Sequence, residues 1–272
     1  MNYSDPAYYL NTDVPLPTRS ESFARISDQD LIADIFMPRD EVRHGGAVLF
    51  LHGGGWKGGH RCGFRWHAHR LSLRGYLACT IDYRLVPAAL FPAALDDCRT
   101  ALDWLIERAK EFQIQPDRIG VVGSSAGGHL AACLGVVDPT RNPPRPPRVR
   151  CVVDVHGLHD LPLMGNHPNA ALCEAFIGGS RIEKQELWEL ASPVRHVNSD
   201  ATPMLITHDP NDQAVPYIQS ANLVDALCRA GRPVQFIPTL DSGHGFFYSP
   251  AAPWTQTLWP IVVEWLDRFL IR

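Results

Sequence analysis

The sequence predicts an α/β fold, in which a mostly parallel sheet carries helices on both faces. Short β-rich runs alternate with longer helical patterns from about residue 30 to the C-terminus. This alternation is typical of parallel strands joined by crossover helices. The length of 272 residues and the hydrophobic fraction of 45% suit a single domain of this class, covering residues 1–272, with a modest insertion.

Seven runs have the composition of strands. They are rich in apolar and β-branched residues and are bounded by Gly, Pro, Asp or Asn. The first is expected to be an antiparallel strand near an edge, and the others to be parallel. The runs cover residues 31–37, 47–51, 77–82, 118–122, 148–155, 203–208 and 234–238.

Three helices are predicted between or after these strands. The clearest pattern covers residues 91–112, where apolar residues recur every three or four positions. Pro92 opens it, at a position where the missing N–H does no harm. A second helix is expected from near Pro216 to Gly231, a typical C-cap. A third covers about 255–270, with its apolar side toward the sheet.

Two segments depart from this alternation. Residues 157–199 separate two strands by far more than a simple crossover needs, so we expect a small lid there. The N-terminal segment, residues 1–25, is expected either to add to the lid or to be disordered. A proline- and arginine-rich stretch, residues 139–148, is interpreted as a stiff surface connector.

A glycine-flanked serine follows the strand at 118–122. The residues Gly123-Ser124-Ser125-Ala126-Gly127 match G-x-S-x-G and lead into a small-residue helical run. In this strand–turn–helix context the pattern predicts a nucleophile elbow, with the hydroxyl of Ser125 held above the sheet edge. The two glycines would let the strand and the helix approach closely.

A second motif follows the strand at 47–51. Its residues are His52, Gly53, Gly54, Gly55 and Trp56. Consecutive glycines expose backbone N–H groups, and two or three such donors aimed at one oxygen atom form an oxyanion hole. We assign this role to Gly54 and Gly55, together with the N–H of the residue after the serine, Ala126. A phosphate-binding loop is disfavoured because no G-K-[ST] follows.

The base and its acid lie near the C-terminus. His244 stands between two glycines after the strand at 234–238. Asp212 stands in a loop after the strand at 203–208, and Asp209 in the same loop is a second candidate acid. A serine needs a base to take its proton, and the base needs an acid to fix its tautomer. The order Ser, Asp, His is that of the α/β-hydrolase fold.

With these residues the chain resembles an esterase of the α/β-hydrolase superfamily, in the hormone-sensitive-lipase-like and acetylxylan-esterase-like (BD-FAE-like) branch. Two positions depart from the usual pattern. Ser124 stands where the lipase-like branch usually has Asp, and Asp209 follows His208 where His-Gly is usual. The resemblance favours Asp212 over Asp209 as the acid. The matching segments are residues 52–56, 82–85, 91–94, 123–128, 212–216 and 243–246.

The resemblance and the motifs together imply a serine carboxylesterase that acts on short- to medium-chain esters without a cofactor. Trp56 and Phe246 are expected to line the substrate pocket. An arylformamidase or peptidase would use the same residues, so amide cleavage is the alternative. A non-catalytic binding protein has less support, because Ser125, Asp212 and His244 are all present.

Composition limits the partners. A net charge of −4 leaves no basic surface for nucleic acid, and no apolar run is long enough to span a membrane.

The first residues do not have the pattern of a secretory signal. Seven cysteines without CxxC spacing predict free thiols, and most of them, including Cys228, are expected in the core. A cytoplasmic location follows as an expectation. No metal is needed for a serine mechanism. The oligomeric state stays open, with a homodimer as one option.

Overall fold

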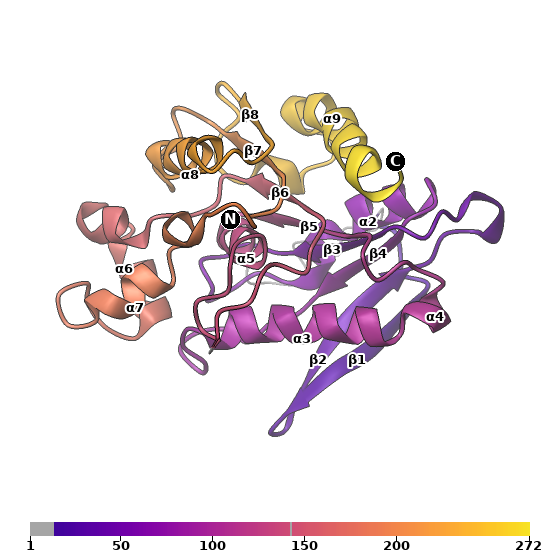
Figure 1. The fold of residues 1–272 in the computed structure, drawn as a ribbon, viewed down its shortest axis with the longest axis horizontal. Helices are drawn as coiled ribbons and strands as arrows, with labels where there is room; N and C mark the ends of the chain where they lie inside the picture. Colours follow the sequence, from indigo (N-terminus) through magenta and orange to yellow (C-terminus); the bar gives the residue numbers. More distant parts are fainter. Residues whose placement is uncertain (1–13, 142) are drawn as a thin grey trace.

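The computed structural model describes residues 14–141 and 143–272, and in it eight strands form one sheet (Figure 1). The strand order is β1-β2-β4-β3-β5-β6-β7-β8. Strands β1 and β2 pair antiparallel, as do β2 and β4, and every other neighbouring pair is parallel. The strands are β1 (Arg19–Ile26), β2 (Gln29–Phe36), β3 (Ala47–Leu51), β4 (Leu77–Ile81), β5 (Ile119–Ser124), β6 (Cys151–Val155), β7 (Met204–His208) and β8 (Val234–Pro238). The predicted α/β-hydrolase architecture is confirmed.

The central strand β3 is apolar throughout because both of its faces are covered. In β3, Ala47, Leu49 and Leu51 pack into one hydrophobic cluster, whereas Val48 and Phe50 pack into the other. Successive side chains of a strand point to opposite faces of its sheet. A strand buried on both sides therefore reads as a continuous apolar run, which is the pattern that predicted it.

Helices cover the two faces unequally (Figure 1). The residues of α2 (Arg65–Ser72) and α9 (Pro253–Leu270) pack against one face. Those of α3 (Ala93–Glu107), α5 (Ala126–Leu134) and α8 (Ile218–Arg229) pack against the other.

The helix predicted at residues 91–112 is interrupted. It breaks at Arg108, and the short α4 (Ala109–Phe112) follows and ends at the left-handed residue Gln113.

The long insertion forms two short helices beside the sheet, α6 (Ala170–Ile177) and α7 (Gln185–Leu190), which Figure 1 shows in salmon and orange. Phe176 and Trp188 anchor them in the same cluster as α3 and α5. The remaining short helical turns are η1 (Asp40–Val42), η2 (Arg61–Phe64), η3 (Leu161–Asn166), η4 (Pro193–His196) and η5 (Phe246–Tyr248).

The expectation for the N-terminal segment, residues 1–25, was wrong for residues 19–25. Residues Arg19–Ile26 form the edge strand β1, paired with β2, so they belong to the sheet and not to the insertion. Their alternating burial, with only Phe23 fully enclosed, is the pattern of an edge strand with one face in solvent. Residues 1–13 lie outside the described part of the chain.

All seven cysteines are free thiols, and six of them are buried. Cys228 was expected in the core but is exposed, because it lies on the solvent side of α8. Among the residues described, no helix has both the length and the hydropathy to cross a membrane.

Candidate active site

Ser125 occupies a strained turn between β5 and α5. Its φ is +56° and its ψ is −121°, a conformation that costs a non-glycine residue about 1–3 kcal/mol. The glycines on either side make the turn feasible. A Cβ on Gly123 would lie 2.1 Å from the carbonyl oxygen of Gly127, and one on Gly127 would lie 2.0 Å from that of Leu51. The turn therefore tolerates no side chain at either position.

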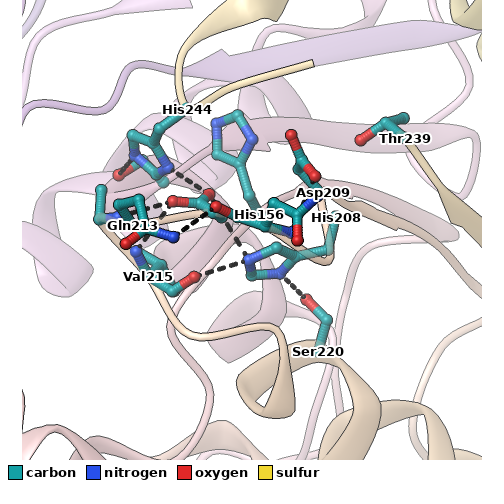
Figure 2. Close-up of polar contacts among 12 residues, drawn as sticks. His156, His208, Asp209, Gln213, Val215, Ser220, Thr239 and His244 are labelled. Atoms are coloured by element: carbon teal, nitrogen blue, oxygen red, sulfur yellow. Dashed lines mark hydrogen bonds and ion pairs between the residues drawn. The ribbon is translucent and has the colours of Figure 1, made fainter. Parts of the chain in front are cut away.

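Ser125, His244 and Asp212 form a continuous hydrogen-bonded chain, part of which Figure 2 shows. His244 Nε2 lies 2.9 Å from Ser125 Oγ, and His244 Nδ1 lies 2.7 Å from Asp212 Oδ2. Ser125 follows β5, Asp212 follows β7 and His244 follows β8. The carboxyl ends of parallel strands share one edge of the sheet, which is why residues up to 119 positions apart meet there.

The Asp212 carboxylate is buried and fully satisfied. Its Oδ1 accepts hydrogen bonds from the N–H groups of Ala214 at 2.8 Å and Val215 at 3.1 Å, while Oδ2 faces His244. Burial by itself raises the pKa of Asp212, but the bond from His244 and the two backbone donors outweigh it and hold the pKa below its usual range. The carboxylate is therefore ionised at neutral pH.

The second candidate acid has a different partner. Asp209 Oδ2 accepts a hydrogen bond from the backbone N–H of Gly243 at 2.8 Å, and Oδ1 accepts one from Asn211 N at 2.9 Å. Asp209 therefore holds the backbone of the histidine loop, one residue before His244. The structure brings Asp212, and not Asp209, to the imidazole.

His208 lies beneath the loop of residues 209–216, which carries Asp209 and Asp212 and is called the acid loop below (Figure 2). Its Nε2 lies 2.9 Å from the carbonyl oxygen of Val215, so this nitrogen carries the proton, and Nδ1 accepts a hydrogen bond from Ser220 Oγ at 2.7 Å. Burial lowers the pKa of His208, which favours the neutral ring. The same Nε2 is 3.6 Å from Asp212 Oδ2. His208 thus supports the carboxylate from below without competing for the proton of His244.

A further histidine, His156, contacts the site and was not among the predicted site residues. Its ring centroid lies 4.2 Å from that of His244, with 36° between the ring planes. Its Nε2 is 2.9 Å from Ser124 Oγ, and its φ is +44°. Burial drives the pKa of His156 well below its usual value, so the ring is neutral. Two signals were present in the sequence: His156 directly follows the predicted strand at 148–155, and Ser124 stands where the lipase-like branch usually has Asp.

The glycine loop, residues 52–56, lies directly beside the turn that carries Ser125. A Cβ on Gly53 would be 2.7 Å from the carbonyl oxygen of Ser124, and the N–H of Gly53 donates to Tyr248 Oη at 2.5 Å. Gly54 and Gly55 have φ values of +111° and +60°, where a side chain would be strained. Within the described part of the chain, the N–H groups of Gly54 and Gly55 donate to no other residue. Both donors are thus available to a ligand.

The two residues expected to line the substrate pocket are both buried. Trp56 is 1% exposed and stacks on Phe176 of α6, with centroids 4.2 Å apart and planes 13° apart. Phe246 is 6% exposed and packs edge-on against His156 at 5.8 Å. Trp56 thus links the glycine loop to the insertion. Phe246 packs against His156, whose ring in turn contacts that of His244. Their part in substrate binding stays a prediction.

One group among the described residues has the donor atoms of a metal site. His156, Asp212 and His244 each offer one ligand atom, all within 4.8 Å of one another. Imidazole and carboxylate suit zinc. However, Asp212 and His244 already hold the proton between them, so an ion here would have to displace it.

Comparisons with known proteins agree with this geometry. The BD-FAE family model matches residues 33–227. The chain is 31% identical over 217 residues to a probable carboxylic ester hydrolase, LipM, from Mycobacterium tuberculosis, a match that covers 73% of this chain and 49% of LipM. It is 28% identical over 233 residues to the esterase LipC from the same organism, covering 80% of this chain and 58% of LipC. The chain therefore spans only about half of the length of these relatives.

Similar solved structures include the apo form of esterase 2 from Thermogutta terrifontis. The TM-score is 0.80 at 25% identity, and the match covers 96% of this chain and 98% of the esterase. The two proteins therefore share a fold over nearly the whole length of both chains.

Proposed function

We propose that this chain, which belongs to the BD-FAE family, is a serine esterase that hydrolyses carboxylic esters through an acyl-enzyme intermediate. The hydrogen-bonded chain Ser125–His244–Asp212 is the observation that carries the proposal. All three members have the distances that proton transfer and charge stabilisation need.

The reaction begins with the serine. His244 Nε2 takes the proton of Ser125 Oγ as that oxygen attacks the ester carbonyl carbon. The proton on Nδ1 stays in its hydrogen bond to Asp212, whose ionised carboxylate stabilises the imidazolium. The elbow helps because its strained backbone presents the hydroxyl at the sheet edge and needs no rearrangement.

The negative charge that develops on the carbonyl oxygen is met by backbone donors. Gly54, Gly55 and Ala126 supply the N–H groups, and Ala126 opens α5, so the positive end of that helix faces the same place. Losing one such donor typically lowers kcat by about 100- to 1,000-fold. The collapse of this intermediate expels the alcohol, which leaves with the proton from His244. Water activated by the same histidine then releases the acid.

Amide cleavage by the same residues is the alternative, and no observation in the described structure favours it. Preference for short or medium acyl chains rests on the modest size of the 157–199 insertion, which we take to be a lid. A cytoplasmic location stays a prediction that rests on the seven unpaired cysteines.

The decisive experiment is hydrolysis of p-nitrophenyl acetate by the wild type and by Ser125→Ala, each checked for folding by circular dichroism. Turnover that disappears in a folded Ser125→Ala protein supports the proposal. Equal slow rates in both would contradict it, because activated esters also react with surface nucleophiles. A parallel assay with p-nitroacetanilide tests the alternative, since Ser125-dependent release of p-nitroaniline is expected of an amidase and not of an esterase.

A further inference from the structure

Helix α6 of the insertion bridges the two loops that supply the site. At its N-terminal end, Asn169 Nδ2 donates to the carbonyl oxygen of Ala214 in the acid loop at 3.0 Å. Toward its C-terminal end, Phe176 stacks on Trp56, the last residue of the glycine loop. The residues of α6 between these anchors are therefore held next to the site.

One of these residues, Leu172, lies against an oxyanion donor. A Cβ built on Gly55 would lie 3.2 Å from Leu172 Cδ2 and 3.4 Å from Cδ1. Since Gly55 has no Cβ, both methyl groups sit at the open side of its backbone. An ester carbonyl held by the N–H of Gly55 would place its substituents within van der Waals reach of these methyls.

Leu172 does not take part in the core, unlike its neighbours on α6. Cys173, Phe176 and Ile177 are at most 1% exposed and belong to the large cluster against the sheet. Leu172 is only half-buried and is not among the partly buried residues that pack against that cluster. Its position is therefore not explained by the packing of the helix, and its apolar surface remains available at the site.

We propose that Leu172 determines acyl-chain specificity by closing the acyl side of the site, so that the substrates are esters of short carboxylic acids. This inference rests on the proposed esterase function. The leaving oxygen must lie within reach of His244 Nε2 to receive its proton, which places the alcohol on the side of the histidine loop. The carbonyl oxygen points at the glycine loop. The acyl chain is the remaining substituent, and it runs past Gly55 toward Leu172.

The test compares p-nitrophenyl esters of increasing acyl length, from acetate to octanoate, in the wild type, Leu172→Ala and Leu172→Trp. We expect the wild type to prefer the short esters. In Leu172→Ala the octanoate-to-acetate ratio of kcat/KM should rise at least about tenfold, since apolar groups in a pocket typically discriminate by that factor or more. Leu172→Trp should lower the butyrate-to-acetate ratio.

Leu187→Ala is the matched control. It makes the same deletion in the same insertion, but Leu187 on α7 packs against the large core cluster. This variant should lose stability while its acyl-length ratios stay at the wild-type values. A second series, acetate esters of ethanol, butanol and benzyl alcohol, tests whether Leu172 faces the acyl chain, as proposed, or the alcohol.

Two outcomes overturn the inference alone. They are Ser125-dependent turnover with unchanged ratios in both Leu172 variants, and a Leu172→Ala effect confined to the alcohol series. Absence of Ser125-dependent turnover with every ester would instead overturn the proposed function, and this inference with it. The Ser125→Ala protein therefore runs beside each series.

Discussion

The imidazole of His156 lies against that of His244, with ring centroids 4.2 Å apart. His156 is fully buried at a φ of +44° and is bonded to Ser124 Oγ, and Ser124 immediately precedes Ser125. The residue next to the proposed nucleophile therefore fixes a ring that in turn limits where the imidazole of His244, the proposed base, can move. His156 is in this sense a positioning residue, which acts through His244.

Removing this support should lower kcat more than it changes KM. We expect His156→Asn, which tolerates the positive φ, to lose about a hundredfold in kcat, because a small displacement of a catalytic group can cost that much. Ser124→Ala, which removes only the tether, should give a smaller loss of the same kind. Steady-state kinetics with p-nitrophenyl butyrate measures both. Wild-type kcat in folded His156→Asn would show that the contact has no part in the reaction.

Replacement of the two carboxylates of the acid loop should lower kcat to very different extents. Asp212→Asn should lower kcat by about 10,000-fold, because the amide no longer stabilises the imidazolium or its tautomer. Asp209→Asn keeps an oxygen for the N–H of Gly243 and should lower activity by less than about tenfold. Both proteins are compared at equal folded fraction. If Asp209→Asn were the more damaged enzyme, the assignment of the acid would be wrong.

The glycines of the elbow should be far less replaceable than a glycine elsewhere whose only constraint is a positive φ. In Gly127→Ala the new Cβ would meet the carbonyl oxygen of Leu51 at 2.0 Å, so we expect a loss of more than about 3 kcal/mol in the free energy of unfolding. The control is Gly231→Ala. That residue has a φ of +66° and nothing within 4 Å of its Cβ, so about 1 kcal/mol of backbone strain is the whole expected cost. Urea denaturation measures both, and equal losses would contradict the close approach.

Acid should destabilise the folded chain through its buried histidines. Burial lowers the pKa of His67 to about 3 and those of His52 and His129 to about 4, and it lowers that of His156 strongly. An unfolded histidine binds its proton near pH 6.5. These residues therefore stabilise the fold above that pH, and the contribution is lost as the pH falls toward 4, by more than about 1 kcal/mol per pH unit for each residue.

His67 offers a direct check of this pH dependence. Within the described residues neither of its ring nitrogens has a hydrogen-bond partner, and it packs among Phe64, Phe247 and Trp259. In His67→Phe the free energy of unfolding should fall less steeply between pH 6.5 and pH 4 than in the wild type. Urea midpoints at several pH values give the slope. An identical slope in the two proteins would mean that His67 does not titrate as described.

Activity should survive metal removal and suffer from added zinc. The proposed mechanism has no step that uses a metal, so dialysis against EDTA should leave kcat unchanged. Excess Zn²⁺ should inhibit reversibly, because His156, Asp212 and His244 offer it three donor atoms and it would displace the proton of His244. Loss of activity on chelation, restored by a metal, would contradict the proposed mechanism.

The parallel strands and the motifs at their ends were predictable because each depends on residues close together in the chain. A strand like β3, with apolar neighbours on both faces, is itself apolar throughout, and a turn without room for a Cβ must carry glycine. Strand β3 and the glycines Gly123 and Gly127 can therefore be recognised from the residues next to them in the sequence. The chain order of Ser125, Asp212 and His244 then indicated which fold places them together.

Other features depended on contacts between distant segments. Asp209 and Asp212 have the same chemistry and stand in the same loop, and only the path of that loop decides which of them reaches His244. His156 reaches the site because β6 lies beside β5 in a register that pairs Ser124 with Val155. Leu172 looks like any apolar residue of a helix, and its contact with Gly55 exists only once α6 is anchored across the site. Such contacts follow from the packing of whole elements, which leaves no local trace in the residues that meet.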